Sequence, residues 1–110
     1  MDSNELDLVF GALSDATRRG ILAQLAAGET NVSALAAPYD ISQPAVSKHL
    51  RVLEKAGLIR REKRGRENFV AVTPGPAQNA ADWVSHYTRL WTAQFDAVDA
   101  YLKKTREPKK

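Results

Sequence analysis

Apolar residues recur every three or four positions through the first half of the chain, which is the spacing of one face of an α-helix. The pattern predicts four helices, over residues 4–13, 16–27, 32–37 and 42–56. Asp15, Asn31 and Ser42 stand at the start of three of them, where their side chains can accept a hydrogen bond from a free backbone N–H. Gly28 and Gly57 follow the second and fourth helices, where a glycine commonly ends a helix.

Beyond Gly57 the sequence predicts strands before it returns to helix. Residues 58–64 and 67–72 are predicted to form two strands, because Gly65 between them permits a tight reversal. The rest of the chain is predicted as a break over residues 73–76, a long helix over 77–104 and a flexible basic tail over 105–110.

This succession of elements indicates the fold. Two short helices joined by a four-residue turn, followed at once by a charged hairpin, describe a winged helix-turn-helix. The predicted fold class is mainly α with a small β-hairpin, in the order α-α-α-α-β-β-α. The 110 residues fit a single domain, taken as residues 1–104 with dimerisation helices at both ends.

Composition narrows the range of functions. The chain contains no cysteine, so disulfides and thiolate metal sites are excluded. No stretch approaches the roughly 20 apolar residues of a membrane span, and the acidic, polar start of the chain is unlike a signal peptide. We therefore expect a cytoplasmic protein with no membrane partner.

The charges are unevenly distributed along the chain. Residues 1–40 carry six acidic residues against two basic ones, whereas residues 48–66 carry eight basic residues against two acidic ones. A cationic segment on an otherwise balanced protein is expected for a polyanion partner. Double-stranded DNA is therefore the predicted partner, bound through the helix 42–56 and the wing 58–72.

The fourth helix carries residue types that can read bases. Its apolar positions, Val46, Leu50 and Leu53, are expected to face the core. Its outer face then carries Ser42, Gln43, Pro44, Ser47, Lys48 and Arg51. Glutamine can bind adenine through two hydrogen bonds, and lysine or arginine can read guanine or hold a phosphate. His49 could contact phosphate or a base, or it could be half-buried and bonded to backbone.

The hairpin tip is also basic. Arg64 and Arg66 flank Gly65, and two arginines so placed can enter a minor groove or straddle a phosphate. Arg60 and Arg61 are adjacent on a strand and point to opposite faces, so at most one of them should face DNA. The wing is thus expected to supply affinity rather than sequence choice.

The last helix carries large apolar residues at helical spacing, more than a monomer of this size needs to cover its core. Together with the apolar positions of the first helix, they predict the seam of a homodimer. The expected interface residues are Leu6, Val9, Phe10, Trp83, Tyr87, Leu90, Trp91, Phe95 and Val98. A two-fold dimer presents two recognition helices, so the DNA site is expected to be an inverted repeat.

The segment ISQPAVSKHLRVLEKAGLI at residues 41–59 resembles the core signature of ArsR-type (arsenic-repressor-like) regulators. The segment LSDATRRGIL at residues 13–22 and the Arg-Gly-Arg tip at 64–66 add to a resemblance that spans nearly the whole chain. The family implies a homodimeric repressor that an inducer removes from its operator. By matching position, it implies base reading by Gln43, Ser47 and Lys48 and the wing role for Arg64 and Arg66.

The chain departs from the family pattern where other members bind metals. Many of them sense metals through a cysteine pair on the third helix, where this chain has TNVSAL at residues 30–35. The last helix carries only Asp82 and His86, four positions apart, whereas zinc generally requires three or four ligands. We therefore expect no metal and no cofactor, and any inducer would be an unknown small molecule.

Two other functions compete with DNA-binding regulation. A winged helix can act as a protein-interaction module without specific DNA binding, although the base-reading residues and the basic wing argue against it. An enzyme is not predicted, because the sequence shows no nucleophile, glycine-rich loop or carboxylate cluster arranged for catalysis. The sequence thus predicts a sequence-specific DNA-binding regulator and leaves its operator, its target genes and its inducer open.

Overall fold

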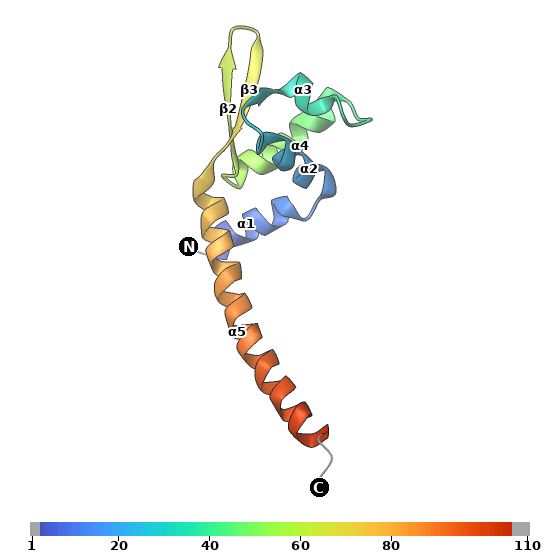
Figure 1. Ribbon diagram of the computed structural model, residues 1–110. Helices are drawn as coiled ribbons and strands as arrows, with labels where there is room; N and C mark the ends of the chain where they lie inside the picture. The colour runs from blue at the N-terminus through green and yellow to red at the C-terminus, as the bar shows by residue number, and fades with distance from the viewer. Residues whose placement is uncertain (1–2, 107–110) are drawn as a thin grey trace. The chain divides into compact units, whose positions relative to one another are not determined.

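The computed structural model describes residues 3–106 of the chain. In chain order its elements are α1 (Ser3–Leu13), α2 (Ala16–Leu25), β1 (Thr30–Asn31), α3 (Val32–Ala36), α4 (Gln43–Lys55), β2 (Ile59–Arg64), β3 (Glu67–Val72) and α5 (Pro74–Arg106) (Figure 1). The chain divides into two compact units, one up to Ala80 and one from Ala81 onward. The first unit holds α1 to β3 and the start of α5, and the second holds the remainder of α5.

Side-chain caps set the starts of three helices in the first unit. Asp15, Asn31 and Ser42 each accept a hydrogen bond from the backbone N–H three residues on, at 3.0, 2.8 and 3.3 Å. Each bond satisfies one of the donors that a first helical turn leaves without a partner. All three predicted caps are confirmed, and α1 to α4 begin and end within two residues of the predicted bounds.

A left-handed glycine ends α4 and turns the chain into β2, as predicted. Gly57 has a φ of 77°, and the Leu58 N–H donates to the Leu53 carbonyl at 3.0 Å, which satisfies one of the last free carbonyls of the helix. A side chain at position 57 would also collide with Pro76, whose Cγ lies 2.8 Å from where a Cβ would stand. Only glycine meets both conditions at the junction of α4 and β2.

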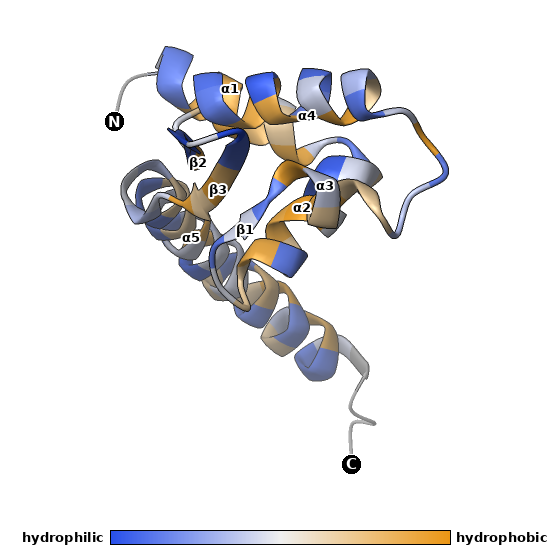
Figure 2. Cartoon of the chain, turned by 90° about the horizontal axis from the view of Figure 1, so that it is seen from above, coloured by the Kyte–Doolittle hydropathy of each residue, from blue (hydrophilic) through white to orange (hydrophobic). Residues whose placement is uncertain are grey.

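The helices of the first unit bury their apolar sides, and Figure 2 shows α1 and α4 blue on one side and orange on the other. The largest side chains without exposed surface are Val9, Ile21, Leu35, Val46, Leu50, Leu53 and Val70. The predicted inward positions of α4 are therefore confirmed. Because one face of α4 is locked into the core, the opposite face is fixed toward solvent.

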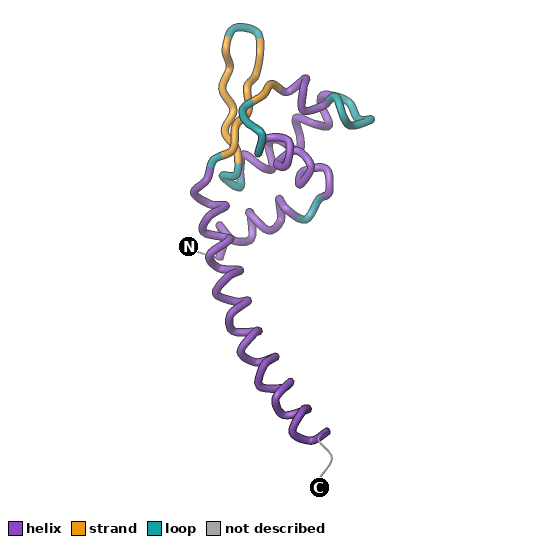
Figure 3. Tube along the Cα trace, in the orientation of Figure 1, coloured by secondary structure: helices purple, strands orange, loops and turns teal. Residues whose placement is uncertain are grey.

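The strands form a three-stranded antiparallel sheet in the order β1-β3-β2. The predicted hairpin of β2 and β3 is present (Figure 3). Gly65 in its turn has a φ of 63°. The sequence does not predict β1, because its two residues, paired with Val70 and Phe69, are too few for a periodic signal. The mainly α winged helix-turn-helix class is confirmed, with this third strand added to the hairpin.

The last helix begins earlier than predicted. The break expected over residues 73–76 is wrong for three of its four residues, because α5 starts at Pro74. Prolines at positions 74 and 76 are tolerated because the N–H groups of a first helical turn have no partner within the helix. The tail expected over residues 105–110 begins inside α5, and residues 107–110 lie outside the described residues. No helix of the described part has the length and hydropathy to cross a membrane.

Candidate nucleic-acid interface

The outer face of α4 carries the residues that the sequence assigns to DNA. Because the opposite face is buried, these side chains are exposed, apart from Ser47, which is half-buried. The exposed residues are Ser42, Gln43, Pro44, Lys48 and Arg51. The Gln43 amide nitrogen donates a hydrogen bond of 3.4 Å to the Ser33 hydroxyl of α3, so its side chain lies across the start of both helices.

A cavity of about 210 Å³ opens beside this face, and we call it the groove. It is lined by Gln43 and Ser47 of α4, by residues of β1 and α3 that include Asn31 and Ser33, and by four hairpin residues, Arg61, Arg66, Glu67 and Asn68. The structure thus brings two predicted base-reading residues together with one predicted wing arginine. The sequence did not predict that Asn31 and Ser33 line the groove, because their place there depends on the pairing of β1 with β3.

The register of the hairpin decides which of two adjacent arginines faces α4. Arg61 lies opposite Val70, which is buried in the core. Side chains alternate between the two faces of a sheet, so Arg61 and Arg60 are on opposite faces. Arg61 bonds the Glu54 carboxylate of α4 at 2.9 Å, whereas Arg60 donates to the Val72 carbonyl at 3.4 Å. The sequence left this choice open because it did not show which strand residue packs inward.

Arg64 has the largest number of partners among the basic residues of the hairpin. Its guanidinium donates to both carboxylate oxygens of Glu29, at 2.7 and 3.1 Å, and to Glu62 at 2.9 Å. It also lies over the ring of Phe69, 4.8 Å from the centroid. The hydrogen bond from Arg64 lowers the pKa of Glu62, and the hydrogen bonds to Glu62 and Glu29 raise the pKa of Arg64. Arg66, in contrast, lines the groove.

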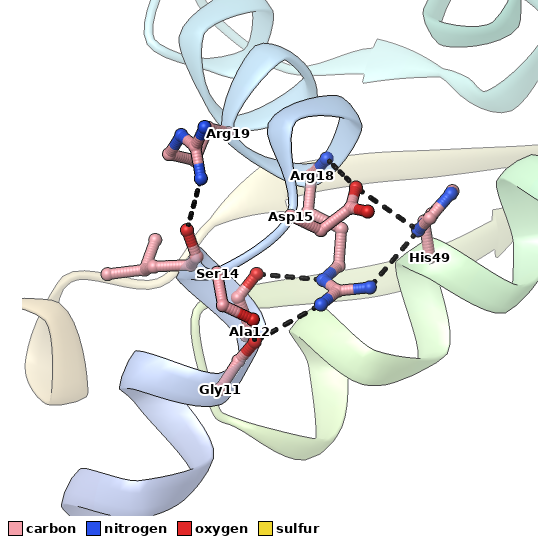
Figure 4. A network of polar contacts seen from close by, with 8 residues as sticks. Gly11, Ala12, Ser14, Asp15, Arg18, Arg19 and His49 are labelled. Atoms are coloured by element: carbon pink, nitrogen blue, oxygen red, sulfur yellow. Dashed lines mark hydrogen bonds and ion pairs between the residues drawn. The ribbon is translucent and has the colours of Figure 1, made fainter.

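A polar network anchors α4 to the junction of α1 and α2 (Figure 4). The Arg18 guanidinium donates to the carbonyls of Gly11 and Ala12 at the end of α1, at 3.1 and 2.7 Å, and lies 3.3 Å from Nδ1 of His49. The Asp15 carboxylate lies 3.8 Å from the same ring nitrogen, and the backbone hydrogen bond from Arg18 lowers the pKa of Asp15. His49 is half-buried, and its partners among the described residues are the side chains of Arg18 and Asp15 and not backbone groups.

The second unit presents a continuous apolar face, which we call the aromatic stripe. Four aromatic residues follow one another at four-residue spacing along α5, with successive ring centroids 5.3, 5.7 and 5.2 Å apart. These side chains are between 42% and 61% exposed. The stripe comprises Trp83, Tyr87, Trp91 and Phe95, with Leu90 and Val98, which are also exposed.

The three α1 residues predicted for a dimer seam lie in different environments. Val9 has no exposed surface and packs in the core of the first unit. Leu6 is half-buried, and Phe10 is exposed. Leu6 and Phe10 therefore retain surface for a partner, while the core accounts for Val9.

Metal ligands are sparse. Asp82 and His86 are both exposed on α5. Within residues 3–106 no three or more histidine, aspartate or glutamate side chains gather in a group that could hold a metal ion.

Comparisons with known proteins agree with this geometry. A family model described as a helix-turn-helix domain matches residues 13–62. The chain is 36% identical over 95 residues to the HTH-type transcriptional regulator Rv2034 of Mycobacterium tuberculosis (strain ATCC 25618 / H37Rv), which covers 86% of this chain and 89% of that protein. It is 31% identical over 96 residues to the arsenical resistance operon repressor of Escherichia coli (strain K12), with 86% and 80% covered.

Two solved structures extend the likeness to three dimensions. The crystal structure of an ArsR family transcriptional regulator superposes with a TM-score of 0.78 at 36% identity, covering 84% of this chain and 95% of that one. A homodimeric winged helix-turn-helix DNA-binding domain from Mycobacterium bovis superposes with a TM-score of 0.61 at 24% identity, covering 96% and 89%. At 24% identity, the likeness to the Mycobacterium bovis domain shows that the two chains share a fold.

Proposed function

Because the chain belongs to the ArsR family of winged helix-turn-helix transcriptional regulators, we propose that it is a homodimeric repressor that binds an inverted-repeat operator. It is a transcriptional regulator and not an enzyme. In this proposal α4 reads the operator sequence, and the wing, residues 58–72, holds the adjacent DNA backbone. The repressor acts on double-stranded DNA in the cytoplasm.

The groove is the observation that carries the proposal. Gln43 and Ser47 of α4 line it together with Arg66 of the wing. A major groove admits an α-helix and shows each base pair through its own donors and acceptors, which side chains on the outer face of such a helix can read. An arginine beside that helix can hold a phosphate in the same encounter. The proposed contact surface is completed by Ser42, Pro44, Lys48 and Arg51.

The aromatic stripe supports the homodimer. Large apolar side chains exposed in one row mark an interaction surface, since burying them removes apolar area from water. The related domain from Mycobacterium bovis is described as homodimeric. We propose that Leu6 and Phe10 of α1 add to the seam. Two α4 helices related by a two-fold axis then require an inverted repeat in the DNA.

The inducer is proposed to be a small molecule that binds without thiols. The Escherichia coli relative is named for arsenical resistance, but this chain has no cysteine. A signal that acts by forming bonds to thiolate sulfur is therefore not available to it. Metal ions at stoichiometric concentration are expected to leave its DNA complex intact.

The experiment that tests the proposal compares operator DNA with scrambled DNA. The operator is first selected from random sequences with the wild-type protein. Gln43→Ala should then lower operator affinity steeply, since one base contact is worth about 1–3 kcal/mol and a symmetric dimer makes it twice. Binding to scrambled DNA should stay nearly unchanged, because Gln43 does not carry charge.

A matched control is Gln78→Ala, which removes another exposed glutamine, on α5. This variant should keep the wild-type ratio of operator to scrambled affinity. If Gln43→Ala, Ser47→Ala and Lys48→Ala all keep that ratio as well, α4 does not read the sequence. If the wild-type protein selects no sequence at all, the repressor proposal fails, and a protein-interaction module becomes the better hypothesis.

A further inference from the structure

The tip of the wing has little support from the sheet. β1 pairs with β3 at Val70 and Phe69, and among the described residues no strand pairs with the outer edge of β3 between Phe69 and the tip. A two-stranded ribbon on its own is marginally stable in water. Yet Arg66, at the tip, lines the groove with residues of α4. A further contact is needed to keep the tip beside α4.

Arg64 and Glu29 make that contact. They are 35 positions apart in the sequence, and Glu29 lies just before β1. Two parallel hydrogen bonds of 2.7 and 3.1 Å join the guanidinium to both carboxylate oxygens. This fork geometry fixes direction as well as distance, which a lysine ammonium does not do. The contact therefore ties the end of β2 to the loop in front of β1.

Two more contacts hold the same guanidinium in place. Glu62 accepts a third hydrogen bond at 2.9 Å, and the ring of Phe69 lies under the guanidinium plane. The Arg64 and Glu29 side chains are only partly exposed, at 47% and 32%. A phosphate that took Arg64 would have to displace two carboxylates that are already within hydrogen-bond distance.

The strand register separates Arg64 from the charges beside α4. Residues 60, 62 and 64 share one face of the hairpin, because side chains alternate along a strand. Arg61 and Lys63 share the opposite face, on which Arg61 bonds Glu54 of α4. Arg64 is therefore on the face away from α4, whereas Arg61 and Arg66 reach the groove.

We propose that Arg64 is a positioning residue, which fixes the wing through Glu29, and that Arg66 delivers the wing's charge to DNA. This inference rests on the proposed function. The sequence assigns the DNA-contacting role of the wing to both arginines, whereas here only Arg66 contacts DNA. Arg64 then affects DNA binding only through the place it gives to Arg66. A phosphate-binding Arg64 would instead act independently of Arg66.

The first test needs no DNA. Amide hydrogen exchange is measured on the free, full-length protein for wild type and Glu29→Gln. Breaking the Arg64–Glu29 ion pair should speed exchange at residues 62–68 by about two- to fivefold, the range expected for one exposed ion pair. The control is Glu67→Gln, since Glu67 is a wing carboxylate without an ion pair among the described residues, and it should leave exchange at residues 62–66 as in wild type. Equal exchange in wild type and Glu29→Gln would show that this ion pair does not hold the wing.

The second test is a double-mutant cycle on the operator with Arg64→Gln, Arg66→Gln and the double variant. Arg66→Gln should reduce the slope of log K against log salt by about 0.9 per phosphate contact, or about 1.8 for a dimer. Adding Arg64→Gln should then change affinity less than about twofold and leave the slope unchanged, because coupled residues are not additive. A further decrease of the slope by a similar amount would make Arg64 a phosphate ligand and overturn the inference.

The two tests also separate this inference from the repressor proposal. If the wild-type protein shows no preference for any DNA sequence, the proposed function fails, and the exchange result still decides whether Glu29 holds the wing. If the wild-type protein binds its operator and the cycle is additive, the proposed function stands and the positioning role fails.

Discussion

α4 and the wing supply side chains to the same groove, but the two elements are held in place differently. α4 is fixed by its buried face, where Val46, Leu50 and Leu53 have no exposed surface. The wing tip has no buried face and is held by ion pairs, Arg61 with Glu54 and Arg64 with Glu29. A helix fixed from behind can give its whole outer face to a ligand. A hairpin tip without a buried face must instead use some of its charged side chains in ion pairs that fix its position.

α4 and the wing are therefore suited to different parts of the DNA. Side chains on a rigid helix can be placed accurately enough to distinguish base edges, which requires hydrogen bonds of defined geometry. An arginine at a hairpin tip is better suited to the DNA backbone, whose phosphates carry the same charge at every sequence. We therefore expect α4 to determine sequence preference and the wing to determine salt-dependent affinity.

The largest expected effect comes from a change that affects α4 and the wing equally. Trp91→Lys places a charge in the aromatic stripe and should separate the protomers while each keeps its fold. Operator binding should then fall toward the non-specific level, by a factor on the order of 10³ or more. Sedimentation at micromolar concentration should show a dimer for wild type and a particle of 12.1 kDa for the variant.

A control for this prediction is Ala93→Lys, because position 93 lies on the opposite side of α5 from Trp91. This variant should remain a dimer and bind the operator as wild type does. A wild-type protein that sediments as a monomer would contradict the proposed seam, as would a Trp91→Lys variant that stays dimeric.

The next largest effect is on the free energy of unfolding, which should depend on the buried face of α4 far more than on the exposed wing. Leu50→Ala removes a fully buried side chain from the core and should lower the free energy of unfolding by about 2–5 kcal/mol. Lys63→Ala removes an exposed side chain from the wing and should change it by no more than about 0.5 kcal/mol. Urea unfolding followed by circular dichroism measures both values, and equal decreases would mean that the wing packs as tightly as α4.

Local chemistry explains why α4 is well predicted from sequence. Ser42 caps it, Gly57 ends it, and the spacing of its apolar residues points to its buried face, so each signal lies within a few residues of what it determines. The same holds for the caps Asp15 and Asn31. The outer face then follows by geometry, which is why the candidate base-reading residues could be named without a structure.

The contacts of the wing could not be predicted from local sequence signals, because they join residues that are far apart in the chain. Glu29 is 35 positions from Arg64, and nothing in the spacing of the two residues relates them. The choice of Arg61 over Arg60 depends on which strand residue faces the core, and the place of Asn31 in the groove depends on a two-residue strand. Long-range pairings of this kind carry no periodicity in the sequence. The predicted break at residues 73–76 failed for a different reason, since prolines mark a helix start as well as a loop.

A smaller effect is expected to separate sequence preference, assigned to α4, from affinity, assigned to the wing. Lys48→Ala on α4 should change the preferred operator at one position in each half-site, at a cost of about 1–3 kcal/mol for each base that the lysine no longer binds. Arg66→Ala on the wing should weaken binding to all sequences alike. Selection from random DNA with each variant shows whether the preferred sequence changes, and titration of operator and scrambled DNA measures the loss of affinity. A new consensus for Arg66→Ala, with an unchanged one for Lys48→Ala, would reverse the roles of helix and wing.

The smallest expected effect concerns stability in acid, because a carboxyl group beside α4, Asp15, and one on the wing, Glu62, have lowered pKa values. The backbone hydrogen bond from Arg18 lowers the pKa of Asp15 from its ordinary 3.8, and the hydrogen bond from Arg64 lowers that of Glu62 from 4.5. A group whose pKa is lower in the folded state contributes stability that is fully present above its unfolded pKa. That contribution disappears as the pH falls through the folded pKa, so both groups contribute in full between pH 6 and 8 and neither should make stability vary with pH there.

The two carboxyl groups should nevertheless report on different parts of the molecule. Asp15 caps α2 and lies beside His49 of α4, so Asp15→Asn should flatten the pH dependence of global unfolding below about pH 3.8. Glu62 pairs with Arg64 of the same hairpin, so Glu62→Gln should flatten the acid dependence of amide exchange in the wing and leave global unfolding as in wild type. Acid titrations by circular dichroism and by hydrogen exchange distinguish the two. If Glu62→Gln shifts global unfolding as far as Asp15→Asn does, the wing is coupled to the core as strongly as α4, and the contrast between the two elements does not hold.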